Sequence, residues 1–182
     1  KWDLYKEEDI DLPRVPLGSV EEDPHSTSLR HGYGADEIDL DETTIRNARR
    51  AYYGSISDID DKVADVMNTL QEAGMADNTI IIFTGDHGDM LGERGMWFKM
   101  SYFEHSARIP LIIHAPSMFS PCRVAEAVSL VDILPTLVEL SQDGKPGDYA
   151  TPIEGRSLVP HMSAGGGHDE VIGEYFAEGG DM

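Results

Sequence analysis

The residues of this chain that could do chemistry come directly after an apolar run. Asp86 and His87 lie in the segment GDHGD at 85–89, which follows Ile80–Phe83. In an open α/β sheet, a buried strand that ends in polar residues delivers them to the ligand-binding edge. A carboxylate beside an imidazole suits Ca²⁺, Mg²⁺, Mn²⁺ or Zn²⁺. We therefore interpret Asp86 and His87 as metal ligands, against the alternative of a turn carboxylate and a loop histidine.

A lysine follows the predicted metal ligands by thirteen residues. Lys99 lies among large apolar side chains, in the segment WFKMSYF at 97–103. This setting predicts partial burial, and a buried ammonium needs an anionic partner. A metal ion that polarises a tetrahedral oxyanion ester and a lysine that neutralises its charge would act together. We interpret Lys99 as a cation that contacts substrate, against the alternative of a solvated surface lysine.

Charged residues lie on both sides of Lys99, and one pair of them, Glu104 and Arg108, is interpreted as placing it. Glu104 and Arg108 are four residues apart, which predicts a structural ion pair on a short helical turn. Asp89 and Glu93 flank the predicted metal loop, where holding the ligands in place and simple solvation are equally good explanations. An arginine at position 94 could pair with either of these two acids.

An acidic and aromatic group lies near the end of the chain. It consists of Glu174, Tyr175 and Glu178. One explanation is a final strand over 170–176 with solvated acids. The other is a wall that binds a quaternary ammonium, because such cations prefer aromatic faces and carboxylates.

The composition excludes some classes of partner. The net charge is −20, which would repel nucleic acid and anionic membrane surfaces but would accept a cationic small molecule or a divalent metal. No apolar run approaches the length of a membrane span. Cys122 is the only cysteine, so an intrachain disulfide is excluded and a reducing compartment fits.

The spacing of apolar residues predicts an α/β chain. Residues 1–40 are polar and rich in Pro and Gly, which predicts an extended segment with loops. A period of three to four predicts a long amphipathic helix over 41–73, with Asp41 as N-cap, Gly74 after its end and an apolar stripe packed on a sheet. Further elements are expected to complete this α/β portion of 41–182: strands at 79–84 and 111–114, the first a central parallel strand, and a helix over 131–140 capped by Asp132.

The order of these motifs resembles the sulfatases of the alkaline phosphatase superfamily. The motifs are Gly-Asp-His-Gly at 85–88, Lys99, Glu-x-x-x-Arg-x-Pro at 104–110 and LVDILPTL at 130–137. Most sulfatases carry Asp-Asn-Gly after the first strand, whereas Asp-His-Gly resembles the subgroup of choline sulfatases and phosphonate monoester hydrolases. The segment GDHGDMLGERGMWFKMSYFE and the opening KWDLYKEEDIDLPRVP are most similar to choline sulfatases.

The resemblance implies an alkaline phosphatase-like sandwich with a central, mostly parallel sheet flanked by helices. It implies that a formylglycine hydrate attacks sulfur while a divalent cation, Ca²⁺ in most members and Mn²⁺ as an alternative, holds the sulfate oxygens. Asp86 and His87 match two family metal ligands, and Lys99 matches the lysine that contacts the sulfate ester. Glu174 or Glu178 would belong to the group around a trimethylammonium.

One departure from the family pattern concerns the nucleophile. The chain contains no C-x-P-x-R or S-x-P-x-R segment, from which formylglycine is made, and Cys122 is followed by Arg-Val-Ala. The paired aspartates of the family's N-terminal half are also missing. We therefore expect residues 1–182 to be the C-terminal part of a catalytic domain, inactive by itself.

The resemblance leads to a specific function for the whole enzyme. We expect it to hydrolyse choline-O-sulfate to choline and sulfate. We also expect a cytoplasmic enzyme, for which a homo-oligomer is one possible state. The alternatives are a phosphonate monoester or phosphodiester hydrolase of the same fold, and a non-catalytic fragment that binds a metal or a partner.

Overall fold

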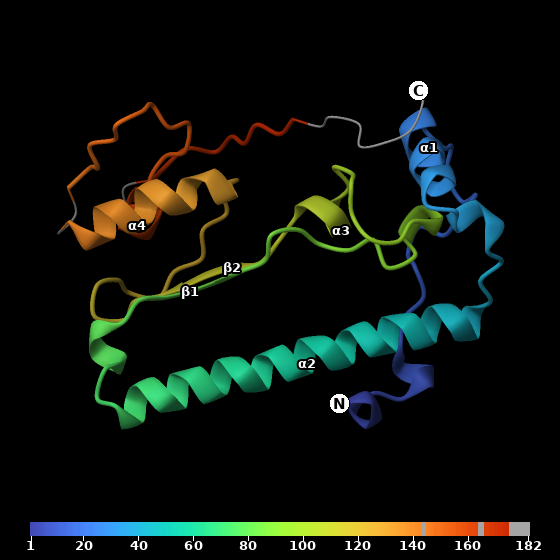
Figure 1. Cartoon of the computed structure of the whole chain (residues 1–182), viewed down its shortest axis with the longest axis horizontal. Coiled ribbons are helices and arrows are strands. Elements are labelled where there is room, and N and C mark those ends of the chain that lie inside the picture. The colour runs from blue at the N-terminus through green and yellow to red at the C-terminus, as the bar shows by residue number, and fades with distance from the viewer. Residues whose placement is uncertain (143–144, 164–165, 175–182) are drawn as a thin grey trace. The chain divides into compact units, whose positions relative to one another are not determined.

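The computed structural model describes residues 1–142, 145–163 and 166–174 (Figure 1). The chain forms two compact units, the first over Lys1–Ile113 and the second beginning at His114. The first unit contains the predicted metal ligands and Lys99. Each unit is described separately below.

The N-terminal segment contains a helix that the sequence analysis did not predict. Helix α1 spans Pro24–Gly32, and three 3-10 turns occupy other parts of residues 1–40. Its N-cap Asp23 accepts a hydrogen bond from the Ser26 amide at 2.9 Å. Pro24 follows at the first helical position, where its missing N–H has no cost. The expectation of extended segment and loop over 1–40 is therefore wrong for this stretch, because the Asp-Pro pair is a helix-start signal.

The long helix is present with the predicted ends. Helix α2 spans Glu42–Glu72, and the carboxylate of its N-cap Asp41 accepts the Thr44 amide at 2.7 Å. Beyond its C-terminus, Gly74 has φ of 67°, in the left-handed region that favours glycine. Local capping chemistry thus determines both ends of α2.

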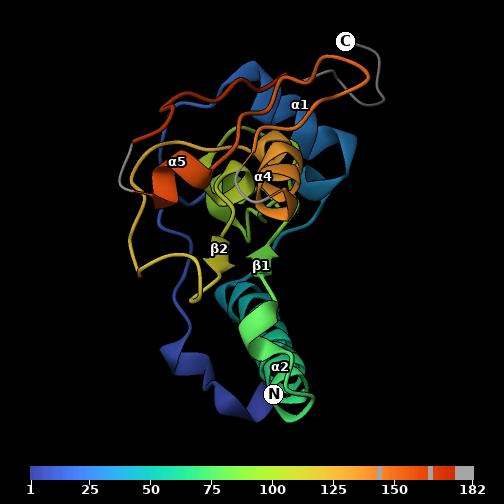
Figure 2. The same cartoon turned by 90° about the vertical axis from the view of Figure 1, so that its left-hand side faces the viewer.

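The apolar stripe of α2 is not covered as expected. Ile56 and Ile59 are each 50% exposed and Val66 is 56% exposed. The strands β1 (Ile81–Thr84) and β2 (Leu111–His114) pair with each other in a two-stranded sheet. Figure 1 shows α2 extending well past these strands, and Figure 2 shows the same helix nearly end-on beneath them. A helix of 31 residues is about 46 Å long, so two short strands cannot cover its stripe.

The segment between the two strands carries much of the buried apolar surface of the first unit. Met90 is 1% exposed and Met96 is fully buried, and Ile10 from the N-terminal segment is 1% exposed. Regular structure here is limited to a 3-10 turn at Glu93–Gly95 and helix α3, Glu104–Ala107. The loop that holds the candidate site therefore has its own packed interior.

The second unit contains short helices around one buried carboxylate. Helix α4 spans Ile133–Ser141 and helix α5 spans Val159–Met162, and a 3-10 turn at Leu130–Asp132 precedes α4. The prediction of a helix here is confirmed. The strand expected over 170–176 does not form in the part that the structure describes, because residues 170–174 have no regular structure.

Contrary to the prediction, the side chain of Asp132 does not cap α4. Its carboxylate instead binds groups from three other segments of the second unit. Its carboxylate accepts the Ser129 amide and the Arg156 amide, each at 2.8 Å, and lies 3.0 Å from Nε2 of His168. Burial raises the pKa of Asp132, but these hydrogen bonds outweigh it and hold the pKa below its ordinary value. Asp132 thus ties three separate segments of the second unit together.

Replacing Asp132 with asparagine is expected to destabilise the chain by about 1–3 kcal/mol at pH 7, because one of the two oxygens that accept the Ser129 and Arg156 amides becomes an NH₂ group that cannot accept. A folded-state pKa below the unfolded value stabilises the fold above about pH 4. This stabilisation is lost as the pH falls through the lowered pKa. Urea unfolding of the two proteins between pH 7 and pH 3 should therefore converge at low pH. The exposed Asp148→Asn is the control, and a constant difference across the pH range would contradict the prediction.

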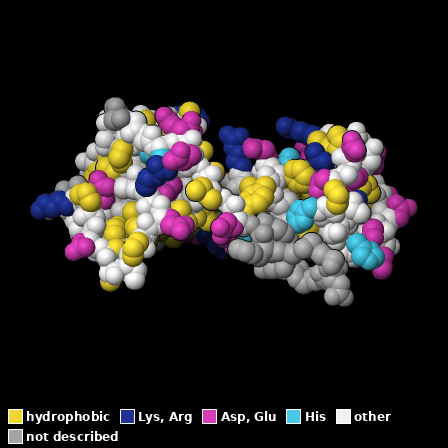
Figure 3. All heavy atoms as spheres, turned by 90° about the horizontal axis from the view of Figure 1, so that it is seen from above, with side chains coloured by type: hydrophobic (Ala, Val, Ile, Leu, Met, Phe, Trp, Pro, Cys, Tyr) yellow, Lys and Arg dark blue, Asp and Glu magenta, His cyan; other side chains and the backbone are white. Residues whose placement is uncertain are grey.

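Figure 3 shows acidic side chains distributed among hydrophobic ones on one face. None of the helices in the described ranges combines the length and the apolar composition that a membrane span requires.

Candidate functional site

The structure brings Asp86 and His87 into a pair just after strand β1. Nδ1 of His87 donates to the Gly88 carbonyl at 2.8 Å, because a carbonyl can only accept. This tautomer leaves the lone pair of Nε2 available for a metal. Nε2 lies 3.5 Å from Oδ2 of Asp86. Two ligand atoms at right angles around a cation with bonds of about 2.0–2.5 Å are roughly 3–3.5 Å apart, so the pair fits a divalent cation.

The two side chains are accessible to a ligand. The Asp86 side chain is 87% exposed and the His87 side chain is 42% exposed. The described part of the chain holds no group of three or more His, Cys, Asp or Glu side chains that could bind a metal ion. Asp86 and His87 can therefore supply part of a coordination shell.

A close backbone contact holds the pair in place. The Gly88 amide donates to the Ser106 carbonyl at 2.7 Å. A Cβ at position 88 would lie 1.9 Å from the carbonyl oxygen of His105, so only glycine fits. Helix α3 itself thus packs directly against the predicted metal loop. Asp89 shapes the other side of this loop by accepting the Leu91 amide at 3.0 Å.

Lys99 lies on a strained part of the loop. Its side chain is exposed, so the expected partial burial is wrong: Phe98 beside it is itself 57% exposed and does not cover it. Phe98 and Met100 have φ of 67° and 75°, which is rare for residues other than glycine. Such conformations cost of order 1–3 kcal/mol each and cluster at functional sites. The backbone on both sides of Lys99 is therefore held in an uncommon conformation.

The expected pair of Glu104 and Arg108 is present. Nη1 of Arg108, the residue just after α3, lies 3.1 Å from Oε2 of Glu104, and both side chains are more than 70% exposed. Exposed pairs of this spacing contribute about 0.3–0.5 kcal/mol. The pair can support the turn of α3 only weakly.

The sequence analysis missed the most buried ionic group of the first unit. Glu93 is 2% exposed and Arg49 of α2 is 5% exposed, and their side chains approach to 3.8 Å. Arg49 also pairs with Asp11 at 2.7 Å. These residues are too far apart in the sequence to be linked by any local pattern. The guanidinium of Arg94, for which a pair with Asp89 or Glu93 was one possibility, lies 4.3 Å from the centre of the Phe103 ring.

The acidic and aromatic group near the end of the chain is only partly described. Glu174 is exposed and lies outside regular structure. Tyr175 and Glu178 lie outside the described residues. The proposed contact of Glu174 with a cationic substrate therefore stays a prediction.

Comparison with known proteins shows the family. The family model described as Sulfatase matches residues 16–143, which include Asp86, His87 and Lys99. This chain belongs to the sulfatase family. The resemblance drawn from its motifs is thereby confirmed.

Relatives within the family carry different names. The chain is 41% identical to a choline-sulfatase of Rhizobium meliloti (strain 1021), over 97% of this chain and 34% of that protein. It is 38% identical to arylsulfatase K of Danio rerio, over 67% of this chain and 23% of that protein. The chain thus spans about a quarter to a third of the length of the curated relatives it matches.

A solved structure confirms the expected fold class. A phosphonate monoester hydrolase from Silicibacter pomeroyi superimposes with a TM-score of 0.73 at 26% identity, over 92% of this chain and 34% of that one. The chain forms part of the alkaline phosphatase-like α/β fold, and the described part of its sheet has two strands.

Proposed function

We propose that the whole protein is a sulfuric ester hydrolase, to which this chain contributes metal ligands Asp86 and His87 and the substrate-contacting cation Lys99. The observation that carries this proposal is the Asp86–His87 pair directly after β1, with Nε2 and Oδ2 3.5 Å apart. Membership of the sulfatase family supports it.

The residues of this chain would have distinct roles. Asp86 and His87 would hold a divalent cation, which we propose is Ca²⁺, and this cation would supply the polarisation of the sulfate oxygens. His87 would bind the cation through Nε2, because its Nδ1–H is held by the Gly88 carbonyl. The ammonium of Lys99 neutralises negative charge that develops on the ester oxygens. The nucleophile, a formylglycine, would come from outside these 182 residues, so this chain alone should be inactive.

We propose choline-O-sulfate as the substrate, hydrolysed to choline and sulfate. The 41% identity to a choline-sulfatase supports this choice. The net charge of −20 suits a substrate with a cationic group, and Glu174 is an exposed carboxylate that could contact it. We also propose that the enzyme is cytoplasmic, because this chain has a single cysteine, Cys122, which fits a reducing compartment, and that it can form a homo-oligomer.

A phosphonate monoester hydrolase is the second candidate, favoured by the structural similarity with a TM-score of 0.73. Rates of the whole protein on choline sulfate, an aryl sulfate and an aryl phosphonate distinguish the two. We expect the highest kcat/KM for choline sulfate, because its positive charge suits an acidic protein. Faster turnover of the phosphonate would overturn the choline proposal and establish the alternative.

A further inference from the structure

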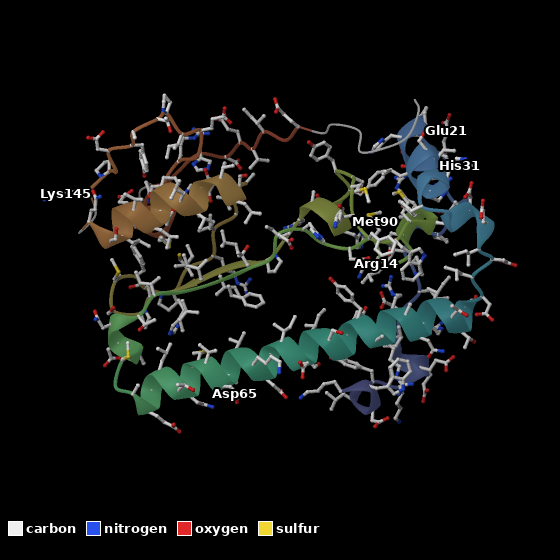
Figure 4. The ribbon with its side chains drawn as sticks, viewed as in Figure 1. Arg14, Glu21, His31, Asp65, Met90 and Lys145 are labelled. Carbon is white, nitrogen blue, oxygen red and sulfur yellow. The ribbon has the colours of Figure 1, made fainter. Side chains whose placement is uncertain are left out.

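The buried side chain of Glu93 joins the Lys99 loop to the N-terminal segment. One oxygen accepts the Arg14 amide at 3.0 Å and the other accepts the Val15 amide at 2.8 Å. In return, the Arg94 amide donates to the Val15 carbonyl at 2.6 Å. Figure 4 shows Arg14 close to the loop that carries Met90. Three hydrogen bonds therefore close a ring between 14–15 and 93–94.

Helix α2 holds the same loop from another side. Nη1 of Arg49 donates to the Leu91 carbonyl at 2.9 Å, and its Nη2 donates to Asp11 at 2.7 Å. Nη1 is also 3.8 Å from the Glu93 carboxylate. One buried cation thus connects α2, the N-terminal segment and the loop, and Glu93 supplies a negative charge beside it.

Backbone contacts extend this anchoring to Lys99. The Met90 amide donates to the Phe98 carbonyl at 2.7 Å, and the Gly92 amide donates to the Met96 carbonyl at 2.8 Å. The carbonyl just before Lys99 is therefore bonded to the base of the loop whose tip Glu93 anchors. The left-handed conformations on both sides of Lys99 persist only where surrounding structure enforces them.

We propose that Glu93 is a positioning residue that acts through Lys99, a proposal that rests on the role of Lys99 in the proposed function. An exposed lysine on a free loop would sample many positions. Anchoring the loop before substrate binds removes the entropic cost of ordering Lys99 during the reaction. The placement matters, because a misplacement of about 1 Å can lower a rate 10²-fold. The two amides, Arg49 and the buried methionines together enforce one loop conformation.

A double-mutant cycle in the whole protein tests the proposal. Glu93→Gln turns one oxygen into an NH₂ that cannot accept an amide, and we expect kcat on a sulfate ester to fall about tenfold or more. With Lys99→Ala already present, the same change should alter kcat less than twofold, because the side chain that Glu93 positions is then absent. An equal loss of kcat in both backgrounds would show that Glu93 is merely structural and would overturn the proposal.

Controls separate the possible failures. Glu21→Gln, an exposed change in the N-terminal segment (Figure 4), should leave kcat unchanged. Thermal unfolding of each variant shows whether assays are made on folded protein. If Glu93→Gln does not fold, Glu93→Asp keeps the charge but cannot reach both amides, and it should show the same coupling to Lys99. A wild type without sulfate-ester activity would instead refute the proposed function.

Discussion

Replacing His87 with alanine is expected to weaken Ca²⁺ binding by the whole protein at least about 100-fold. Loss of residues that only orient metal ligands costs 10–100-fold in affinity, so loss of a ligand should cost more. Nε2 of His87 faces the carboxylate of Asp86 at 3.5 Å, and its other nitrogen is held by the Gly88 carbonyl. Asp86→Asn should have a similar effect, because the amide is a weaker ligand than a carboxylate.

Calorimetric titration of metal-depleted protein with Ca²⁺ and Mn²⁺ measures this effect. His31→Ala is the matched control, since His31 is exposed, pairs with Asp36 and is far along the chain from the site (Figure 4). The 182-residue chain alone should bind weakly, because its described residues hold no group of three ligands. Wild-type affinity in the His87 variant, or tight binding by the chain alone, would contradict the proposed site.

Lys99→Ala is expected to lower kcat/KM on a sulfate ester by about 10²–10³-fold, the loss found when one donor to a developing oxyanion is removed. The ammonium should stabilise the transition state more than the bound substrate, so kcat should fall more than KM rises. Lys99→Arg keeps the positive charge but replaces the compact ammonium with a planar guanidinium, and it should retain part of the activity.

Steady-state kinetics of the whole protein check this prediction. Lys145→Ala, an exposed lysine of the second unit (Figure 4), is the control and should leave both constants unchanged. Unfolding curves should match the wild type, because an exposed side chain contributes little to stability. If Lys99→Ala keeps wild-type kcat/KM, Lys99 is a solvated surface lysine and has no role in the reaction.

Features that depend on neighbours in the sequence were predictable. The ends of α2 follow from Asp41 and Gly74, whose side chain and backbone act within a few residues. The placement of Asp86 and His87 just after β1 follows from an apolar run and its polar end. Helix α1 was predictable by the same chemistry, since Asp23 and Pro24 form a start signal that the polar composition of residues 1–40 obscured.

Features that depend on distant segments were decided only by the tertiary structure. Glu93 contacts Arg14, Val15 and Arg49, which are so distant in the sequence that no local pattern indicates the contact. The exposure of Lys99 and of the α2 stripe also could not be predicted, because burial depends on which surfaces meet. Two short strands cannot cover a helix of 31 residues. The sequence by itself determined the elements and the chemistry at their ends, and tertiary packing decided which charged groups are buried together and hold the loop of Lys99.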